Sequence, residues 1–242
     1  MNNQKSKFQS FLFSSIKEVI FIVIGILIAL YINNIDTNIK ANNEALDFIS
    51  EINSELKIDT ANLNSTVKYS DKLLKDYLSI LKTKNLDTIS TSKLIEIYNS
   101  PTMMINISDA NYSRLKNSNV QFVEKFEDIF KTINIYYTSF NTYKQSANDL
   151  ELDLYQLNIK DNYLQNDIEI GLPIEGNSII QDSIIRRKNI IKYFRSIKGR
   201  NNLTMMYARM YRMKEASKMA YQFSSKLVTK TDFILKVNNR KK

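Results

Sequence analysis

The chain has 242 residues, a formal net charge of +9 and 43% hydrophobic residues, and it contains no His, no Cys and no Trp. Without Cys it has neither disulfide bonds nor a cysteine nucleophile, and without His it lacks the usual general base and transition-metal ligand. Its four glycines are scattered, so no glycine-rich loop can hold a phosphate. Together with only two prolines, this composition favours an all-α, non-enzymatic protein without a cofactor.

The net charge is divided unevenly along the chain. Residues 186–242 contain 17 of the 34 basic residues and only two acids, which gives this segment a charge of +15. The first 185 residues therefore carry a charge of −6. Such a division indicates either two faces that attract each other or a basic region for an anionic partner.

The first predicted element is a transmembrane helix. Residues 19–32 are an uninterrupted apolar run, and extending it back to Phe11 gives 22 residues, about 33 Å of helix, which is enough to span a bilayer. We therefore expect a cytoplasmic tail over residues 1–10, an anchor over 11–34 and an extracytoplasmic domain over 35–242. A buried core helix and a cleaved signal peptide are the alternatives, but bulky residues occupy the positions where cleavage requires small ones.

Three lysines before the apolar run and a single one soon after it predict the orientation of this anchor. Lys5, Lys7 and Lys17 precede the run, whereas only Lys40 follows within twenty residues. The positive-inside rule then predicts a single-pass membrane protein with a cytoplasmic N-terminus and an extracytoplasmic C-terminal domain. Gly25 and Ala29 form a small-xxx-small pair through which two copies could approach closely, although apolar helices often contain such a pair by chance.

A heptad-like apolar stripe predicts a long amphipathic helix over residues 35–81 that can continue directly from the anchor. Its length of about 70 Å requires a partner helix, because a solitary amphipathic helix is unstable in water. The stripe consists of Ile35, Ile39, Leu46, Ile49, Ile52, Leu56, Leu63, Val67, Leu74, Tyr77 and Leu81.

Two short helices and a second long one are expected next. The short helices cover residues 93–99 and about 108–118, with Ser108 as N-cap and Asn119 in a left-handed conformation. The long one covers residues 120–168, and we expect its aromatic side chains to be core rather than a cofactor site. These aromatics are Phe126, Phe130, Tyr137 and Phe140.

Two basic helices complete the predicted antiparallel bundle from about residue 178. Ser178 and Gln181 form a capping box that starts a helix ending at Gly199. The last helix covers residues 203–237 and has small residues in the middle of its apolar seam. If the chain reverses direction at each break between helices, the two short helices lie at the end of the bundle farthest from the membrane. The loop 171–176 then lies near the bilayer.

Two patches of the chain resemble a known family. Residues 17–34 read KEVIFIVIGILIALYINN, and Asn111 to Asn119 with Tyr136-Tyr137 provide a second patch. Both are similar to segments of the DUF6090-type family of uncharacterised single-pass membrane proteins from Bacteroidetes. Lys17, Tyr31, Ile35-Asp36 and Asn119 depart from its usual pattern. The resemblance implies a helical protein of the bacterial inner membrane, hence with its extracytoplasmic domain in the periplasm, and no particular activity.

Two further groups of residues are candidates for binding. The first group has a structural interpretation, in which two residues pack into the bundle and two turn the chain, and this interpretation is the simpler one. If a small molecule binds outside the membrane, this group is where we expect it. The group comprises Tyr112, Leu115, Ser118 and Asn119. Because each predicted helix reverses the direction of the one before it, the C-terminal end of the last helix should return to the membrane. Its basic side chains would meet anionic lipid there. This end comprises Lys236, Arg240, Lys241 and Lys242.

The acidic clusters carry little functional weight. They are Glu124, Glu127 and Asp128, and Asp149, Glu151 and Asp153. None lies beside a His or in an EF-hand spacing, so solvated helix faces explain them better than a metal site does.

The leading hypothesis is a membrane-anchored scaffold or sensor that binds a protein partner or the envelope surface. The partners implied are membrane lipid, an unidentified protein and a second copy of the chain. The alternative is a basic nucleic-acid-binding helical protein whose apolar N-terminal helix is buried. The stretch from Arg186 to Arg200, with Tyr193 and Phe194 among its bases, motivates this alternative. A periplasmic location would exclude nucleic acid.

Overall fold

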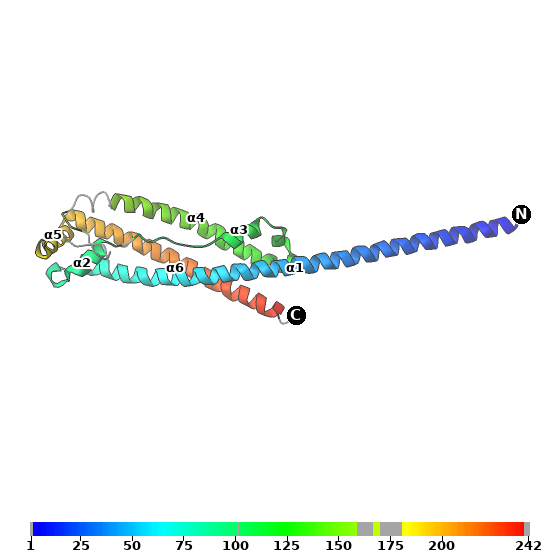
Figure 1. The fold of residues 1–242 in the computed structure, drawn as a ribbon, viewed down its shortest axis with the longest axis horizontal. Helices are drawn as coiled ribbons and strands as arrows, with labels where there is room; N and C mark the ends of the chain where they lie inside the picture. Colours follow the sequence, from blue (N-terminus) through cyan, green and yellow to red (C-terminus); the bar gives the residue numbers. More distant parts are fainter. Residues whose placement is uncertain (1, 101, 159–166, 170–180, 240–242) are drawn as a thin grey trace.

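The structure, a computed structural model, describes residues 2–100, 102–158, 167–169 and 181–239 (Figure 1). The described residues form an all-α fold, as the composition predicts. Its six α-helices are α1 (Asn2–Lys82), α2 (Thr91–Tyr98), α3 (Ala110–Lys116), α4 (Glu127–Asn158), α5 (Ser183–Arg195) and α6 (Ile197–Asn239). Three short 3-10 helices connect them: η1 (Leu86–Thr88), η2 (Asn119–Phe122) and η3 (Glu124–Phe126).

Helix α1 joins the apolar segment and the bundle in a single element of 81 residues. Neither Gly nor Pro occurs between residues 26 and 82, so nothing in the sequence interrupts the helical hydrogen bonds. The N-terminal part projects beyond the bundle, and residues 17–40 are all exposed (Figure 1). This helix is long and apolar enough to cross a membrane. The buried-helix alternative is not what the structure shows, because none of the described elements covers residues 17–40.

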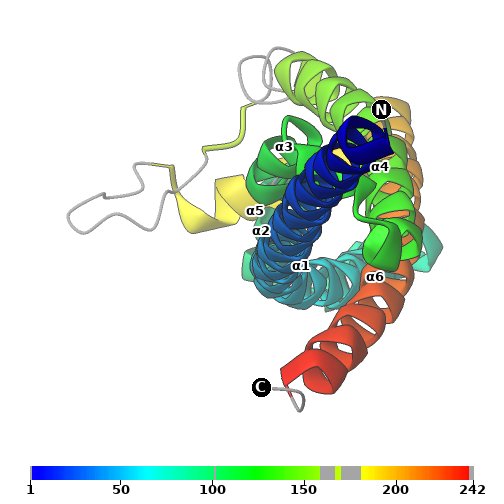
Figure 2. The ribbon, with the colours of Figure 1, turned by 90° about the vertical axis from the view of Figure 1, so that its right-hand side faces the viewer.

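Three long helices form the bundle, and α6 runs antiparallel to the other two. Lys57 of α1 pairs with Asp232 of α6 at 2.8 Å, whereas Arg200 at the start of α6 donates to the carbonyl of Leu81. Helix α4 has the direction of α1, because Arg209 near the start of α6 pairs with Glu151 near the end of α4. Viewed from the anchor end, α1 projects in front of both partners (Figure 2).

The path of the chain differs from the predicted one. Residues 102–109 are extended rather than helical, and they carry the chain back along the bundle from α2 to α3 (Figure 1). Helix α3 therefore lies toward the anchor, where Arg114 pairs with Glu51 of α1 at 2.9 Å. Helix α4 consequently runs outward instead of returning. The loop 171–176 lies outside the described residues.

The starts of several helices also differ from the prediction, among them α4, which begins at Glu127 rather than at residue 120. Helix α3 begins at Ala110 after Asp109 rather than at Ser108, and Asn119 begins a 3-10 helix instead of adopting a left-handed position. Helix α5 begins after Asp182, whose carboxylate accepts the N–H groups of Ile184 and Ile185. Gln181 bonds to residues 167 and 169, and Ser178, the other residue of the predicted capping box, lies outside the described residues.

Gly199 lies inside α6 and does not end the preceding helix. The break is at Ser196, whose hydroxyl accepts the N–H of Gly199 at 3.0 Å and donates to the carbonyl of Tyr193 at 2.7 Å. A Cβ at position 199 would lie 2.0 Å from that carbonyl oxygen. Gly199 is therefore required for the close approach of α5 and α6.

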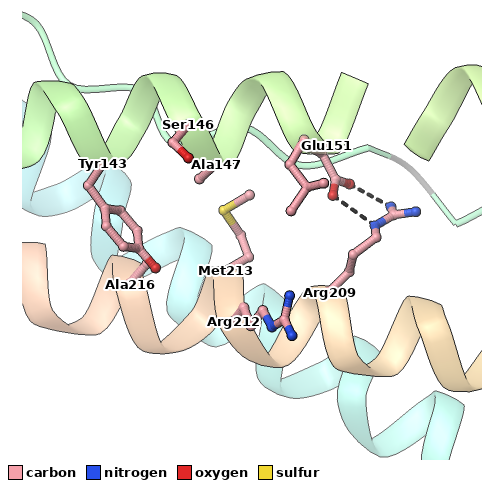
Figure 3. Close-up of a pocket in the computed structure, with 9 residues that line it drawn as sticks. Tyr143, Ser146, Ala147, Glu151, Arg209, Arg212, Met213 and Ala216 are labelled. Atoms are coloured by element: carbon pink, nitrogen blue, oxygen red, sulfur yellow. Dashed lines mark hydrogen bonds and ion pairs between the residues drawn. The ribbon is translucent and has the colours of Figure 1, made fainter. Parts of the chain in front are cut away.

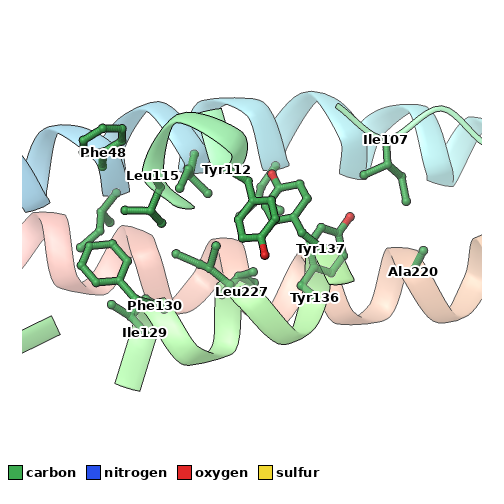
Figure 4. Close-up of a cluster of buried hydrophobic side chains, with 14 of the residues drawn as sticks. Phe48, Ile107, Tyr112, Leu115, Ile129, Phe130, Tyr136, Tyr137, Ala220 and Leu227 are labelled. Carbon is green, nitrogen blue, oxygen red and sulfur yellow. The ribbon is translucent and has the colours of Figure 1, made fainter. Parts of the chain in front are cut away.

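Two buried clusters make up the core. The cluster nearer the anchor joins residues 45–63 of α1 to α3, α4 and α6, and it contains Phe130, Tyr136 and Tyr137 (Figure 4). The distal cluster joins residues 73–80 to α2, α5 and the start of α6. The predicted aromatic core is confirmed for Phe126, Phe130 and Tyr137, while Phe140 is partly buried.

The predicted seams of α1 and α6 are largely confirmed. In α6 the small residues Ser217, Ala220 and Ser224 are almost fully buried. In α1 most of the stripe is buried from Ile49 onward, with Val67 and Leu81 half-buried, whereas Ile35 and Ile39 are 43% and 54% exposed. The heptad pattern is therefore continuous, but only its distal part has a partner helix among the described residues.

Candidate functional site

The anchor segment presents a bare apolar surface. Gly25 has nothing within 4 Å of the position that a Cβ would take, and Ala29 is exposed. The fold of one chain therefore imposes no requirement for a small residue at position 25. Whether these two residues pack against a second copy stays a prediction.

Tyr112 and Leu115 are core residues, as their simpler interpretation predicts. Both are buried, and the Tyr112 ring stacks on Tyr137 with 4.6 Å between the ring centroids (Figure 4). The Tyr112 hydroxyl donates to Asn134. Their predicted position at the distal end is wrong, because α3 lies toward the anchor.

Ser118 and Asn119 turn the chain after α3. The Ser118 hydroxyl donates to the Leu115 carbonyl at 2.8 Å, and Asn119 is exposed. A cavity of about 550 Å³ adjoins Tyr112 and Leu115, but neither Ser118 nor Asn119 lines it. The four residues of this patch are thus not brought together around one cavity.

Two buried carboxylates of α1 hold the chain where it enters α3. The Glu55 carboxylate accepts the N–H groups of Ala110 and Asn111, at 3.1 and 3.2 Å. It therefore caps α3 from a different helix and lies at the positive end of the α3 dipole. Asp59 accepts the N–H of Ser108 through Oδ1 at 3.2 Å.

Asp59 has an unusually basic carboxyl group. Its side chain is 3% exposed and its Oδ2 atom has no hydrogen-bond partner. The pKa of Asp59 is raised to about 6, mainly by burial and in smaller part by the neighbouring negative charge of Glu55, while the hydrogen bond from the Ser108 N–H opposes the increase. Sequence analysis missed both carboxylates. Their only signal is an i, i+4 pair of acids beside the apolar stripe.

The extended segment 102–109 is held by polar side chains along one face of α4. Asn148 both accepts the N–H and donates to the carbonyl of Ile105, each at 3.0 Å, and Lys144 donates to the carbonyl of Ile107 at 2.9 Å. Ile105 and Ile107 are buried while Asn106 between them is exposed. This alternation of apolar residues is visible in the sequence and is the signal of an extended segment.

Glu151 and Arg209 form a buried ion pair between α4 and α6 (Figure 3). Arg209 donates through Nε and one terminal nitrogen, at 2.8 and 2.6 Å, to the two oxygens of Glu151. The Arg209 side chain is 13% exposed and the Glu151 side chain is 5% exposed, and both adjoin a cavity of about 150 Å³. The pair thus has a structural role, and within the described residues no group of three acids, histidines or cysteines could hold a metal ion.

The basic C-terminal third docks partly on the rest of the bundle. Lys214 pairs with Asp71 at 2.7 Å and Arg195 pairs with Asp87 at 2.8 Å. Tyr193 and Phe194, the aromatic residues among the bases, are buried against Tyr98 in edge-to-face contacts. They are therefore not available to stack on nucleic-acid bases.

Of the predicted lipid-contact residues the structure describes Lys236, which lies toward the anchor side of the bundle. Lys236 is exposed in the last turn of α6, and the neighbouring Asn238 accepts a hydrogen bond from Lys125 just before α4. Arg240, Lys241 and Lys242 lie outside the described residues. Contact with lipid stays a prediction.

The distal end of the bundle combines basic and apolar side chains. A cavity of about 680 Å³ lies along α5, and its lining includes Ile184, Lys188 and Lys192 together with the paired Asp87 and Arg195. Ile184 and the nearby Ile197 are 77% and 81% exposed.

Comparison of the chain with protein-family models, curated proteins and solved structures finds no match. The resemblance to the DUF6090-type family accordingly stays a prediction.

Proposed function

We propose that this chain is a non-enzymatic, membrane-anchored helical scaffold or sensor whose bundle binds a protein partner or the envelope surface. The observation that carries the proposal is the continuity of α1, in which an exposed apolar segment passes without a break into the bundle. The part of α1 that follows the apolar segment is about 70 Å long, at 1.5 Å per residue. Because this helix is continuous, it holds the distal end of the bundle at about that distance from the outer end of the anchor.

Its location follows from the charges beside the apolar run. Lys5, Lys7 and Lys17 support a cytoplasmic N-terminus in the bacterial inner membrane, with the bundle in the periplasm. The proposed partner is unidentified, and lipid or a second copy are further partners consistent with the exposed anchor.

Extraction of isolated membranes tests the anchor. We expect the chain to stay with the membrane in alkaline carbonate and in high salt, and to dissolve only in detergent. Release by carbonate or salt alone would support the alternative, a basic nucleic-acid-binding protein. A reporter active only in the periplasm, fused after residue 242, should be active, whereas activity of a cytoplasm-only reporter there would refute the orientation.

A further inference from the structure

The distal end of the bundle has the properties of a docking surface. Residues 183–200 contain seven bases and no acid, and they form α5 and the first turn of α6. Lys188 and Lys192 are exposed and lie four residues apart, so both project from one face of α5. Ile184 lies one turn before Lys188 on that same face.

Among the described residues, Arg195 of this surface pairs with Asp87, whereas Arg187 and Arg200 bond to neutral groups. Arg187 donates to the carbonyls of Asp87 and Ile89 and to the Thr91 hydroxyl, all of them neutral acceptors. Arg200 donates to the neutral carbonyl of Leu81. Such bonds fix the position of a guanidinium group without neutralising it, so the surface stays strongly positive.

The apolar part of the surface is unusual for a solvated helix. Ile184, Ile185 and Ile197 are 77%, 53% and 81% exposed, and the first of them borders the 680 Å³ cavity together with Lys188 and Lys192. Exposed isoleucines beside a cavity rimmed by bases match a ligand that carries both aliphatic and anionic groups.

We infer that residues 183–200, here called the tip, dock an acidic amphipathic helix of a protein partner. Carboxylates of that helix would contact Lys188 and Lys192, and its aliphatic side chains would contact Ile184. The inference rests on the proposed function, because a distance of about 70 Å from the anchor keeps the tip away from its own bilayer. Nucleic acid fits less well, since it would offer no aliphatic group to Ile184 and the neighbouring Tyr193 and Phe194 are buried.

Fluorescence anisotropy of the full chain in zwitterionic detergent micelles tests this inference. The probe is a labelled helical peptide with leucine on one face and glutamate on the other. We expect it to bind, and to bind about tenfold more weakly to Lys188→Glu/Lys192→Glu and to Ile184→Ser. The matched control is Lys226→Glu/Lys230→Glu, which reverses two exposed lysines at the same spacing on α6 and should bind like wild type.

Four outcomes would overturn the docking surface: no binding of the peptide, equal binding by the tip variants, equal binding of a peptide with glutamine for glutamate, or tighter binding of single-stranded DNA. Phosphatidylglycerol vesicles provide the lipid comparison, and tip-dependent binding to them in preference to the peptide would also overturn it. Because these variants change only exposed side chains far from the anchor, they should stay in the membrane pellet. Loss of peptide binding and loss of membrane anchoring are therefore separate results.

Discussion

At the scale of single residues, the decisive positions are those where two elements approach closely or where a polar group is buried. Gly199 and Asp59 are the clearest examples. The first permits contact between the backbones of α5 and α6, and the second places a carboxyl group in the core beside the turn that enters α3. Neither role can be recognised from the neighbouring residues in the sequence.

We expect stability to depend on pH through Asp59. Its folded pKa of about 6 lies above the ordinary aspartate pKa of 3.8, so the folded state binds this proton more tightly than the unfolded state. The resulting stability is fully present below about pH 4 and is lost as the pH rises to about 6. Asp59→Asn should therefore raise the free energy of unfolding at pH 7 by about 1–3 kcal/mol, with little change at pH 4.

Thermal melting at both pH values measures this effect. Glu55→Gln is the matched control, because it removes the negative charge that caps α3 and should destabilise the protein at pH 7. Equal destabilisation by Asp59→Asn and Glu55→Gln at pH 7 would show that the Asp59 carboxyl is ionised without penalty.

Gly199→Ala should destabilise the bundle although alanine is the better helix former. The new methyl group would meet the Tyr193 carbonyl at 2.0 Å, so α5 must shift relative to α6. We expect a loss of about 2–4 kcal/mol in chemical denaturation. Gly25→Ala has open space around its Cβ and should leave the bundle unchanged. A stabilising Gly199→Ala would mean that the corner adapts freely.

At the scale of elements, side chains of one helix often complete the hydrogen bonds of another segment. The α4 side chains Lys144 and Asn148 satisfy the backbone of residues 102–109, and Glu55 satisfies the start of α3. The extended segment can thus be buried without a sheet, because buried backbone groups need partners of any kind. These contacts also determine that α4 runs outward.

The ion pair between α4 and α6 allows a double-mutant test. Glu151→Leu alone leaves Arg209 buried without a counter-charge and should cost about 3–5 kcal/mol, whereas Glu151→Leu/Arg209→Leu should recover much of that loss. Urea denaturation measures both. Lys131→Ala, which breaks an exposed pair with Glu127, should change nothing measurable. Additive losses in the double variant would contradict a coupled pair.

At the scale of the whole molecule, the bundle is a rod whose two ends differ in chemistry. The anchor end has an apolar helix and Lys236, while the distal end has exposed isoleucines and bases. Because α6 is antiparallel to α1, its last residues return toward the anchor. The predicted path was wrong, but the described end of α6 lies on the side of the apolar segment; its distance from a membrane stays a prediction.

Energy transfer from single labels to headgroup-labelled lipids tests this arrangement. The chain has no Cys, so Lys236→Cys and Thr91→Cys each provide one labelling position. With α1 perpendicular to the bilayer, the rise per residue along α1 gives the distance of each label from the bilayer surface. This distance is about 25 Å for position 236 and about 70 Å for position 91. We expect strong transfer at 236 and weak transfer at 91. Equal transfer at both positions would mean that the rod lies on the bilayer.

The periodicity of the sequence was enough to predict the helical class, the apolar segment, the seams of α1 and α6 and the aromatic core of α4. Each of these depends on the spacing of apolar residues within one helix, which is a local property. The tertiary structure alone decided the return path of residues 102–109, the direction of α4 and the capping of α3. These features depend on groups far apart in the chain, such as Glu55 and Ala110, whose pairing becomes favourable only when both are buried in the same place.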